Sequence, residues 1–180
     1  PSVGDVGTFA RGLANQKGIR TRLTRDIEAL RKAAEEEGVP AQTRSDVLEE
    51  LATVEVNLRQ ASAAFGEDFE AVLPLNSWHE QVLRTQAWLW RARGLAPLTF
   101  WHSNLWDAVP LIGAPDAAAL LTAGAGQAVD VHLMRGEHRA GAFNVSNSSD
   151  EAMEVSFRLS GLPGGDNPAY ATVHEVIWTD

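Results

Sequence analysis

The chain has 180 residues, of which 44% are hydrophobic and 22% charged, a balance that predicts a packed globular protein of one or two domains. Its net charge of −9, with no basic run among its 15 Lys and Arg residues, argues against a nucleic-acid partner. The absence of cysteine excludes disulfides, thiolate metal sites and a cysteine nucleophile.

No apolar run approaches the roughly 20 residues that cross a bilayer, and no charged-then-apolar segment opens the chain. We therefore expect no membrane insertion and no signal peptide in this chain. Because it begins at Pro1 without an initiator Met, we interpret it as a processed or excised piece of a larger multidomain protein.

Helical periodicity dominates the front of the chain. Residues 1–20 have little apolar periodicity and are expected to form a flexible entry. Apolar residues then recur at helical spacing until Gly38-Val39-Pro40 ends the first run, and two further runs follow. The helices are expected at residues 21–37, 43–65 and 77–93. Residues 1–96 are therefore predicted to form a helical domain of three helices.

The second half has a different character. Residues 95–180 hold three Arg and ten Asp or Glu, a charge of −7, whereas residues 1–94 hold 12 basic and 14 acidic residues, a charge of −2. Strand-like runs separated by turn residues predict a β-sandwich-like domain over 97–180. The strands are expected at residues 129–134, 140–147, 153–159 and 172–178. The fold class is predicted to be α+β, with the three-helix unit packed on this antiparallel domain.

Tryptophan is concentrated around the predicted junction of the two domains, where five of the six tryptophans lie within 29 positions. Exposed indole rings stack on sugar rings, and nearby polar side chains can bond sugar hydroxyls. The candidate carbohydrate-binding residues are Trp88, Trp90, Trp101, Asn104, Trp106 and Asp107. The alternative, which the energetics of aromatic burial favours, is that the rings fill the junction between helices and sheet.

Residues that carry catalysis or bind metals form no recognised pattern. His132 and His138 with Glu137 could converge across a hairpin, but their spacing matches no metal signature, and surface histidines are the favoured interpretation. Glu137 is expected to form solvated pairs with Arg135 and Arg139. No nucleophile elbow or glycine-rich phosphate loop is present. We predict no catalytic residue, no metal and no cofactor.

The stretch from Phe100 to Trp178 resembles a known family. The resemblance rests on Trp101, Asn104, Trp106, Val109-Pro110, Pro115, His132–Glu137, Ala142–Asn147, Gly161–Gly164 and Val173–Trp178. It resembles the β-sandwich accessory domains beside the catalytic barrel in large bacterial glycoside-hydrolase-like proteins. It implies a secreted or cell-envelope setting and a carbohydrate-related parent enzyme. The catalytic carboxylates of that family would lie in the barrel, so none is assigned to this chain.

Three functional hypotheses follow. The first is a non-catalytic accessory module of a secreted carbohydrate-active protein, whose partners are neighbouring domains of the same parent chain and a polysaccharide. The second is a protein-interaction or scaffold module in which the helical unit offers an apolar stripe to a partner. The third is a small hydrolase that uses Glu137 with another acid.

Overall fold

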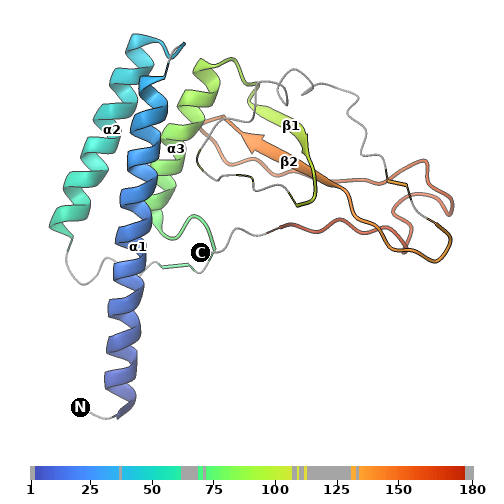
Figure 1. Ribbon diagram of the computed structural model, residues 1–180, viewed down its shortest axis with the longest axis horizontal. Coiled ribbons are helices and arrows are strands. Elements are labelled where there is room, and N and C mark those ends of the chain that lie inside the picture. The colour runs from blue at the N-terminus through green and yellow to red at the C-terminus, as the bar shows by residue number, and fades with distance from the viewer. Residues whose placement is uncertain are drawn as a thin grey trace.

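The structure is a computed structural model in which residues 3–36, 38–61, 69–70, 72–106, 109, 112, 131–132 and 134–176 are described. Within these residues the elements are α1 (Val3–Glu35), α2 (Ala41–Gln60), α3 (Ser77–Ala92), β1 (Leu98–Ser103) and β2 (Ala142–Asn147). Figure 1 shows the three helices side by side, with the two strands extending away from them. The chain is therefore α+β.

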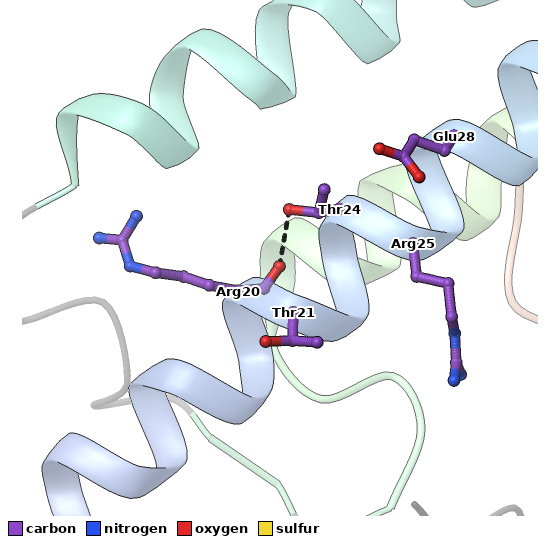
Figure 2. A pocket seen from close by; sticks show the side chains of 5 residues that line it. All are labelled: Arg20, Thr21, Thr24, Arg25 and Glu28. Carbon is purple, nitrogen blue, oxygen red and sulfur yellow. Dashed lines mark hydrogen bonds between the residues drawn. The ribbon is translucent and has the colours of Figure 1, made fainter.

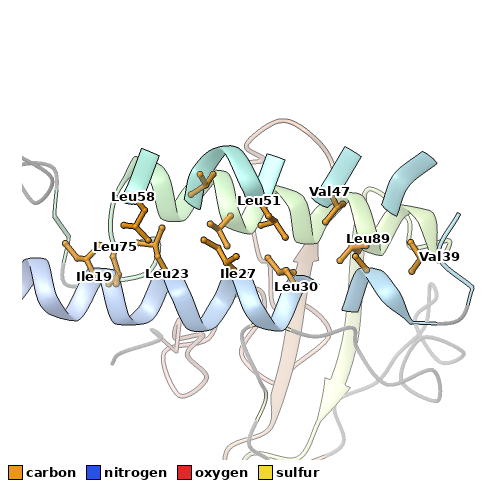
Figure 3. Packing of buried hydrophobic residues seen from close by; sticks show 13 residues of the cluster. Ile19, Leu23, Ile27, Leu30, Val39, Val47, Leu51, Leu58, Leu75 and Leu89 are labelled. Atoms are coloured by element: carbon orange, nitrogen blue, oxygen red, sulfur yellow. The ribbon is translucent and has the colours of Figure 1, made fainter. Parts of the chain in front are cut away.

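The three helices bury their apolar stripes against one another and form one core (Figure 3). Leu23 and Ile27 of α1, Leu51 of α2 and Val82 of α3 are each at most 2% exposed. Each helix contacts both of the others, so the three apolar stripes meet in one core. This confirms the predicted three-helix unit.

Helix α1 begins far earlier than predicted. The expected range of 21–37 covers only the part that packs, whereas α1 begins at Val3 and ends at Glu35. Its packed part starts at Ile19, which is 1% exposed, and its first half extends past the other helices (Figure 1). None of the described side chains before Ile19 is buried, and a helical segment without a buried face needs no apolar stripe, so the sequence pattern missed this half.

The turn between α1 and α2 depends on Gly38, whose φ of 90° lies in the left-handed region that side chains disfavour. Pro40 then precedes the first residue of α2, where its missing N–H costs no helical hydrogen bond. The predicted helix over 43–65 is too long at its end, because α2 stops at Gln60 and Ala61 is extended. Residues 62–65 lie outside the described residues.

Helix α3 agrees with the predicted range of 77–93 to within one residue. Its N-cap is Asn76, whose side-chain oxygen accepts a hydrogen bond from the backbone N–H of His79 at 2.9 Å. At the other end Gly94, with φ of 89°, turns the chain out of the helix toward β1. Strand β1 therefore begins a few residues after the end of α3.

Strands β1 and β2 form an antiparallel ribbon, which pairs Leu98 with Asn147 at one end and Ser103 with Ala142 at the other. The predicted strand over 140–147 is confirmed from Ala142 onward. Strand β1 was not predicted, although it lies at the start of the predicted second domain. Residues that face each other across the ribbon share a face, so Phe100, Phe143 and Val145 lie on one, mainly apolar side, and Thr99, Asn144 and Ser146 lie on the other together with Trp101.

The other predicted strands are wrong within the described residues. Residues 153–159 and 172–176 have no strand, nor do the described positions of 129–134, and residues 129–130, 133 and 177–178 lie outside the described part. Around Leu159 the chain makes local hydrogen bonds instead. The backbone N–H of Leu159 donates to the side-chain oxygen of Asn167, and the backbone N–H of Asn167 donates to the carbonyl of Leu159. The described residues therefore contain a two-stranded ribbon and not a sandwich.

Candidate functional site

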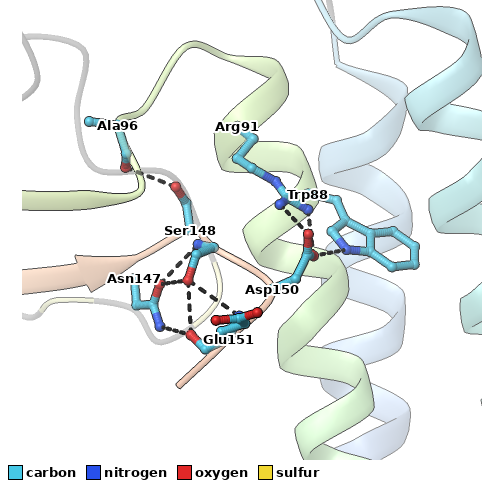
Figure 4. Close-up of polar contacts among 8 residues, drawn as sticks. Trp88, Arg91, Ala96, Asn147, Ser148, Asp150 and Glu151 are labelled. Carbon is cyan, nitrogen blue, oxygen red and sulfur yellow. Dashed lines mark hydrogen bonds and ion pairs between the residues drawn. The ribbon is translucent and has the colours of Figure 1, made fainter. Parts of the chain in front are cut away.

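The turn that follows β2 joins the ribbon to α3. Asp150 accepts two hydrogen bonds from the Arg91 guanidinium, Nη1 to Oδ2 at 2.6 Å and Nη2 to Oδ1 at 2.7 Å. The indole Nε1–H of Trp88 also donates to Oδ1 at 3.2 Å (Figure 4). One carboxylate thus receives three hydrogen bonds from a single helix. We call this set of three residues the Asp150 contact.

The charges in the Asp150 contact support each other. Hydrogen bonds from Arg91, and to a lesser extent from Trp88, hold the pKa of Asp150 below its ordinary value. Hydrogen bonding to Asp150 in turn raises the pKa of Arg91. Both side chains therefore remain charged near neutral pH. The pair is exposed to water, so salt is expected to weaken it.

Ser148 fixes the same turn to the start of β1. Its side chain is fully buried, its backbone N–H donates to the carbonyl of Pro97, and its hydroxyl donates to the carbonyl of Ala96, both at 2.9 Å. The turn also holds its own shape, because Asn147 accepts hydrogen bonds from the N–H and hydroxyl of Ser149 (Figure 4). The ribbon and the helices are therefore connected through polar contacts.

The five described members of the six predicted carbohydrate-binding residues lie in different surroundings. Trp88 is half-buried, packs on the helical core and belongs to the Asp150 contact, while Trp90 is half-buried at the end of α3. Trp101 lies on the polar face of the ribbon, where its indole donates to Ser146 Oγ at 2.9 Å. Trp106 is 91% exposed and Asn104 is exposed beside it in sequence. Asp107 lies outside the described residues.

A buried polar network inside the bundle was missed. Asp26 of α1 and His79 of α3 are 2% and 0% exposed, and the His79 Nε2 nitrogen lies 3.0 Å from Asp26 Oδ2. The backbone N–H of Leu75 donates to His79 Nδ1 at 3.1 Å, which places the ring hydrogen on Nε2, from where it is donated to Asp26. Arg22 Nε donates to the same Oδ2 at 2.6 Å.

Electrostatics in this network favour the ionised carboxylate. Burial alone raises the pKa of Asp26, but hydrogen bonds from His79 and Arg22 and the charge of Arg22 outweigh it and lower the pKa. Both ring nitrogens of His79 are occupied, so the imidazole has no nitrogen left to act as a base. Asp26 and His79 are 53 positions apart, and no motif in the sequence connects them.

The predicted pairing of Glu137 with Arg139 is confirmed. Glu137 Oε1 accepts from Arg139 at 2.7 Å, and Oε2 accepts from the backbone N–H of Met134 at 2.9 Å. The hydrogen bond from Met134, followed by that from Arg139, lowers the pKa of Glu137. In the part of the chain that the structure describes, no three His, Asp or Glu side chains are grouped as a metal site would require.

An open hollow lies along α1 (Figure 2), lined by Arg20, Thr21, Thr24, Arg25 and Glu28. Two of the lining side chains donate hydrogen bonds to backbone carbonyls of the helices. Thr24 donates to the carbonyl of Arg20 at 2.9 Å, and the Arg20 side chain points to the end of α2, where it donates to the carbonyls of Leu58 and Ala61. Arg20 therefore satisfies carbonyls that the helix leaves unpaired at its C-terminus.

Comparison with protein-family models, with curated proteins and with solved structures found no match. None of the described helices combines the length and apolar character that a membrane span needs.

Proposed function

We propose that this chain is a non-catalytic accessory module of a secreted carbohydrate-active multidomain protein, whose role is to hold the ribbon in a set orientation on a helical base. The Asp150 contact carries this proposal. Three hydrogen bonds from α3 to the Asp150 carboxylate, together with the two from Ser148 to residues 96–97, restrain the ribbon at its base. The carbohydrate setting rests on the resemblance of residues 100–178.

The use of the titratable groups supports a structural role. Asp26 and His79 are hydrogen-bonded to each other inside the bundle, and Asp150 and Glu137 are each paired with an arginine. A hydrolase working through Glu137 would need that carboxylate to face a second acid, whereas it faces Arg139. The scaffold alternative calls for an uncovered apolar helix stripe, whereas the described apolar residues of the three helices lie mostly in the common core, with Leu13 and Val56 exposed.

An antiparallel ribbon of this kind is also suited to form part of one sheet of a β-sandwich. It is antiparallel, with apolar side chains on one face and hydrogen-bonded polar side chains on the other. We propose that in the parent protein this ribbon contributes two strands to a sandwich-like domain.

The experiment measures the orientation of the ribbon directly. The chain has no cysteine, so Arg84→Cys on α3 and Ala140→Cys, two positions before β2, can carry spin labels at exposed positions. Pulsed electron spin resonance is expected to give one narrow distance distribution, which Asp150→Asn broadens. Glu151→Gln is the matched control, because the described hydrogen bonds of Glu151 use only its backbone atoms. A distribution already broad in the double-cysteine chain, or one that Asp150→Asn leaves unchanged, would contradict the proposal.

A second candidate function is glycan contact through Trp106. The observation that favours it is the 91% exposure of this ring, at a turn directly after β1. Titration with bacterial and plant polysaccharides is expected to shift the tryptophan emission and reduce acrylamide quenching. The shift should vanish in Trp106→Ala and persist in Trp101→Phe. No shift with any polysaccharide would refute glycan contact and leave the structural role intact.

A further inference from the structure

One face of the ribbon is mainly apolar, and the described side chains on it are partly exposed. Phe100 of β1 and Phe143 and Val145 of β2 share this face and are 40%, 38% and 38% exposed. Phe157, which follows the ribbon in sequence, joins them through a ring contact with Phe143 at 5.3 Å and is 45% exposed. We call these four residues the apolar face. A two-stranded ribbon is at best marginally stable unless such a face is packed.

The opposite face needs no further partner. Thr99 and Ser146 are buried there at the base of the ribbon, and Trp101 donates to Ser146. Farther out, Asn144 Nδ2 donates to Ser103 Oγ at 2.8 Å. Polar groups on that side are thus satisfied within the chain. The asymmetry between the two faces points to a docking surface on the apolar side only.

We infer that the apolar face docks against the apolar surface of a neighbouring domain in the same polypeptide. This inference rests on the proposed function, in which the helical base presents the ribbon to that domain. The area available decides between this partner and a second copy. Large aromatic side chains bury about 200 Å² each, so four residues about 40% exposed offer roughly 300 Å².

Counting both partners, the contact would bury roughly 600 Å². That is the low end for two domains of one chain, at about 600–1,500 Å². It is about half of the 1,200 Å² at which stable complexes of separate molecules begin. A second copy of this chain is therefore too weakly held by this face, whereas a tethered domain has no association entropy of free molecules to overcome.

Charge specifies the partner further. Residues 95–180 carry three Arg and ten Asp or Glu, a charge of −7, so the part of the chain that bears the apolar face is acidic overall. A complementary surface would be apolar at its centre and basic at its rim, because like charges brought together at an interface oppose binding. The structure thus points to a neighbouring domain with Lys or Arg residues around an apolar patch.

Hydroxyl-radical footprinting tests this on two proteins, the 180-residue chain and the proposed multidomain parent that contains it. Oxidation of Phe143 and Phe157 is expected to be about fourfold slower in the longer polypeptide, in proportion to the exposed area that an interface core loses. Tyr170, which is 66% exposed and outside the apolar face, is the internal reference and should not change. Equal oxidation of the two phenylalanines in both proteins would overturn the inference.

A double variant and one further measurement test the remaining alternatives. Phe100→Thr with Val145→Thr keeps strand-forming residues in place, and in the longer polypeptide it should restore oxidation of Phe143. Sedimentation of the 180-residue chain should show a monomer. A dimer with protected phenylalanines would identify a second copy as the partner, and protection in the monomer would mean that the chain covers its own face. Either result overturns the inference, while the spin-label distances test the proposed function separately.

Discussion

Replacing Asp26 by alanine tests the energetics of the bundle most directly. The change removes the Asp26 carboxylate from Arg22, a residue that is 6% exposed, and leaves the Nε2–H of His79 without the acceptor it has in Asp26. Breaking one side of a buried ion pair costs about 3–5 kcal/mol, since the remaining charge stays desolvated. That is a large share of the roughly 5–15 kcal/mol by which domains are stable. We therefore expect Asp26→Ala to be close to unfolding.

Urea unfolding followed by far-ultraviolet circular dichroism measures the loss without screening the ion pair. Asp46→Ala, on the exposed side of α2, is the control and should change stability by less than about 0.5 kcal/mol. In a double-mutant cycle, Asp26→Ala and His79→Ala should show a coupling of at least about 1 kcal/mol. A loss under about 1 kcal/mol for Asp26→Ala, with an unchanged denaturant slope, would refute the reasoning.

Four further outcomes follow from the structure. Because the folded-state pKa of Asp26 lies below its ordinary value of 3.8, its stabilising contribution is complete above that value and is lost as the pH falls through the lower one. Between about pH 5 and about pH 2 the urea midpoint should therefore fall more for the unmodified chain than for Asp26→Asn. Leu51→Ala should cost about 2–5 kcal/mol, whereas Val56→Ala, 43% exposed on the same helix, should cost less than about 1 kcal/mol, both by urea unfolding. Trp106→Ala should change the free energy of unfolding by less than about 1 kcal/mol, and a larger loss would show that the ring is packed. Arg20→Ala frees the carbonyls of Leu58 and Ala61 and should lower stability by about 1 kcal/mol, with less helix signal from the end of α2.

The spacing of apolar residues in the sequence predicted the helices well where those residues pack in the core. The spacing of Leu23 and Ile27 follows the face that meets α2 and α3, and Gly38 marks the turn because its left-handed backbone disfavours other residues. The first half of α1 left no such trace, since none of its residues with a described side chain before Ile19 is buried. Its glycines made a flexible segment the natural expectation, although glycine weakens a helix by only about 1 kcal/mol.

The ribbon and the polar contacts depend on pairs far apart in sequence. Phe100 pairs with Val145, and this choice of partner cannot be deduced from the alternation of either segment alone. The 153–159 segment alternates equally well but has no partner strand among the described residues. The candidate site shows the same difficulty, because tryptophan content indicated a binding surface, whereas the contacts of Trp88 and Trp101 are set by Asp150 and Ser146.

Burial in the core begins part-way along α1, so the protection of backbone amides from hydrogen exchange is expected to vary along this one helix. From Ile19 onward, opening a backbone hydrogen bond also disturbs the core, so amide hydrogen exchange there should approach the rate set by global unfolding. Before Ile19 no described side chain is buried, so opening the helix there leaves the core intact, and an isolated helical stretch of this length is marginal in water. Exchange should therefore be fastest near Val3 and slow by orders of magnitude across Ile19. A single helix thus contains both the least and the most protected backbone of the bundle.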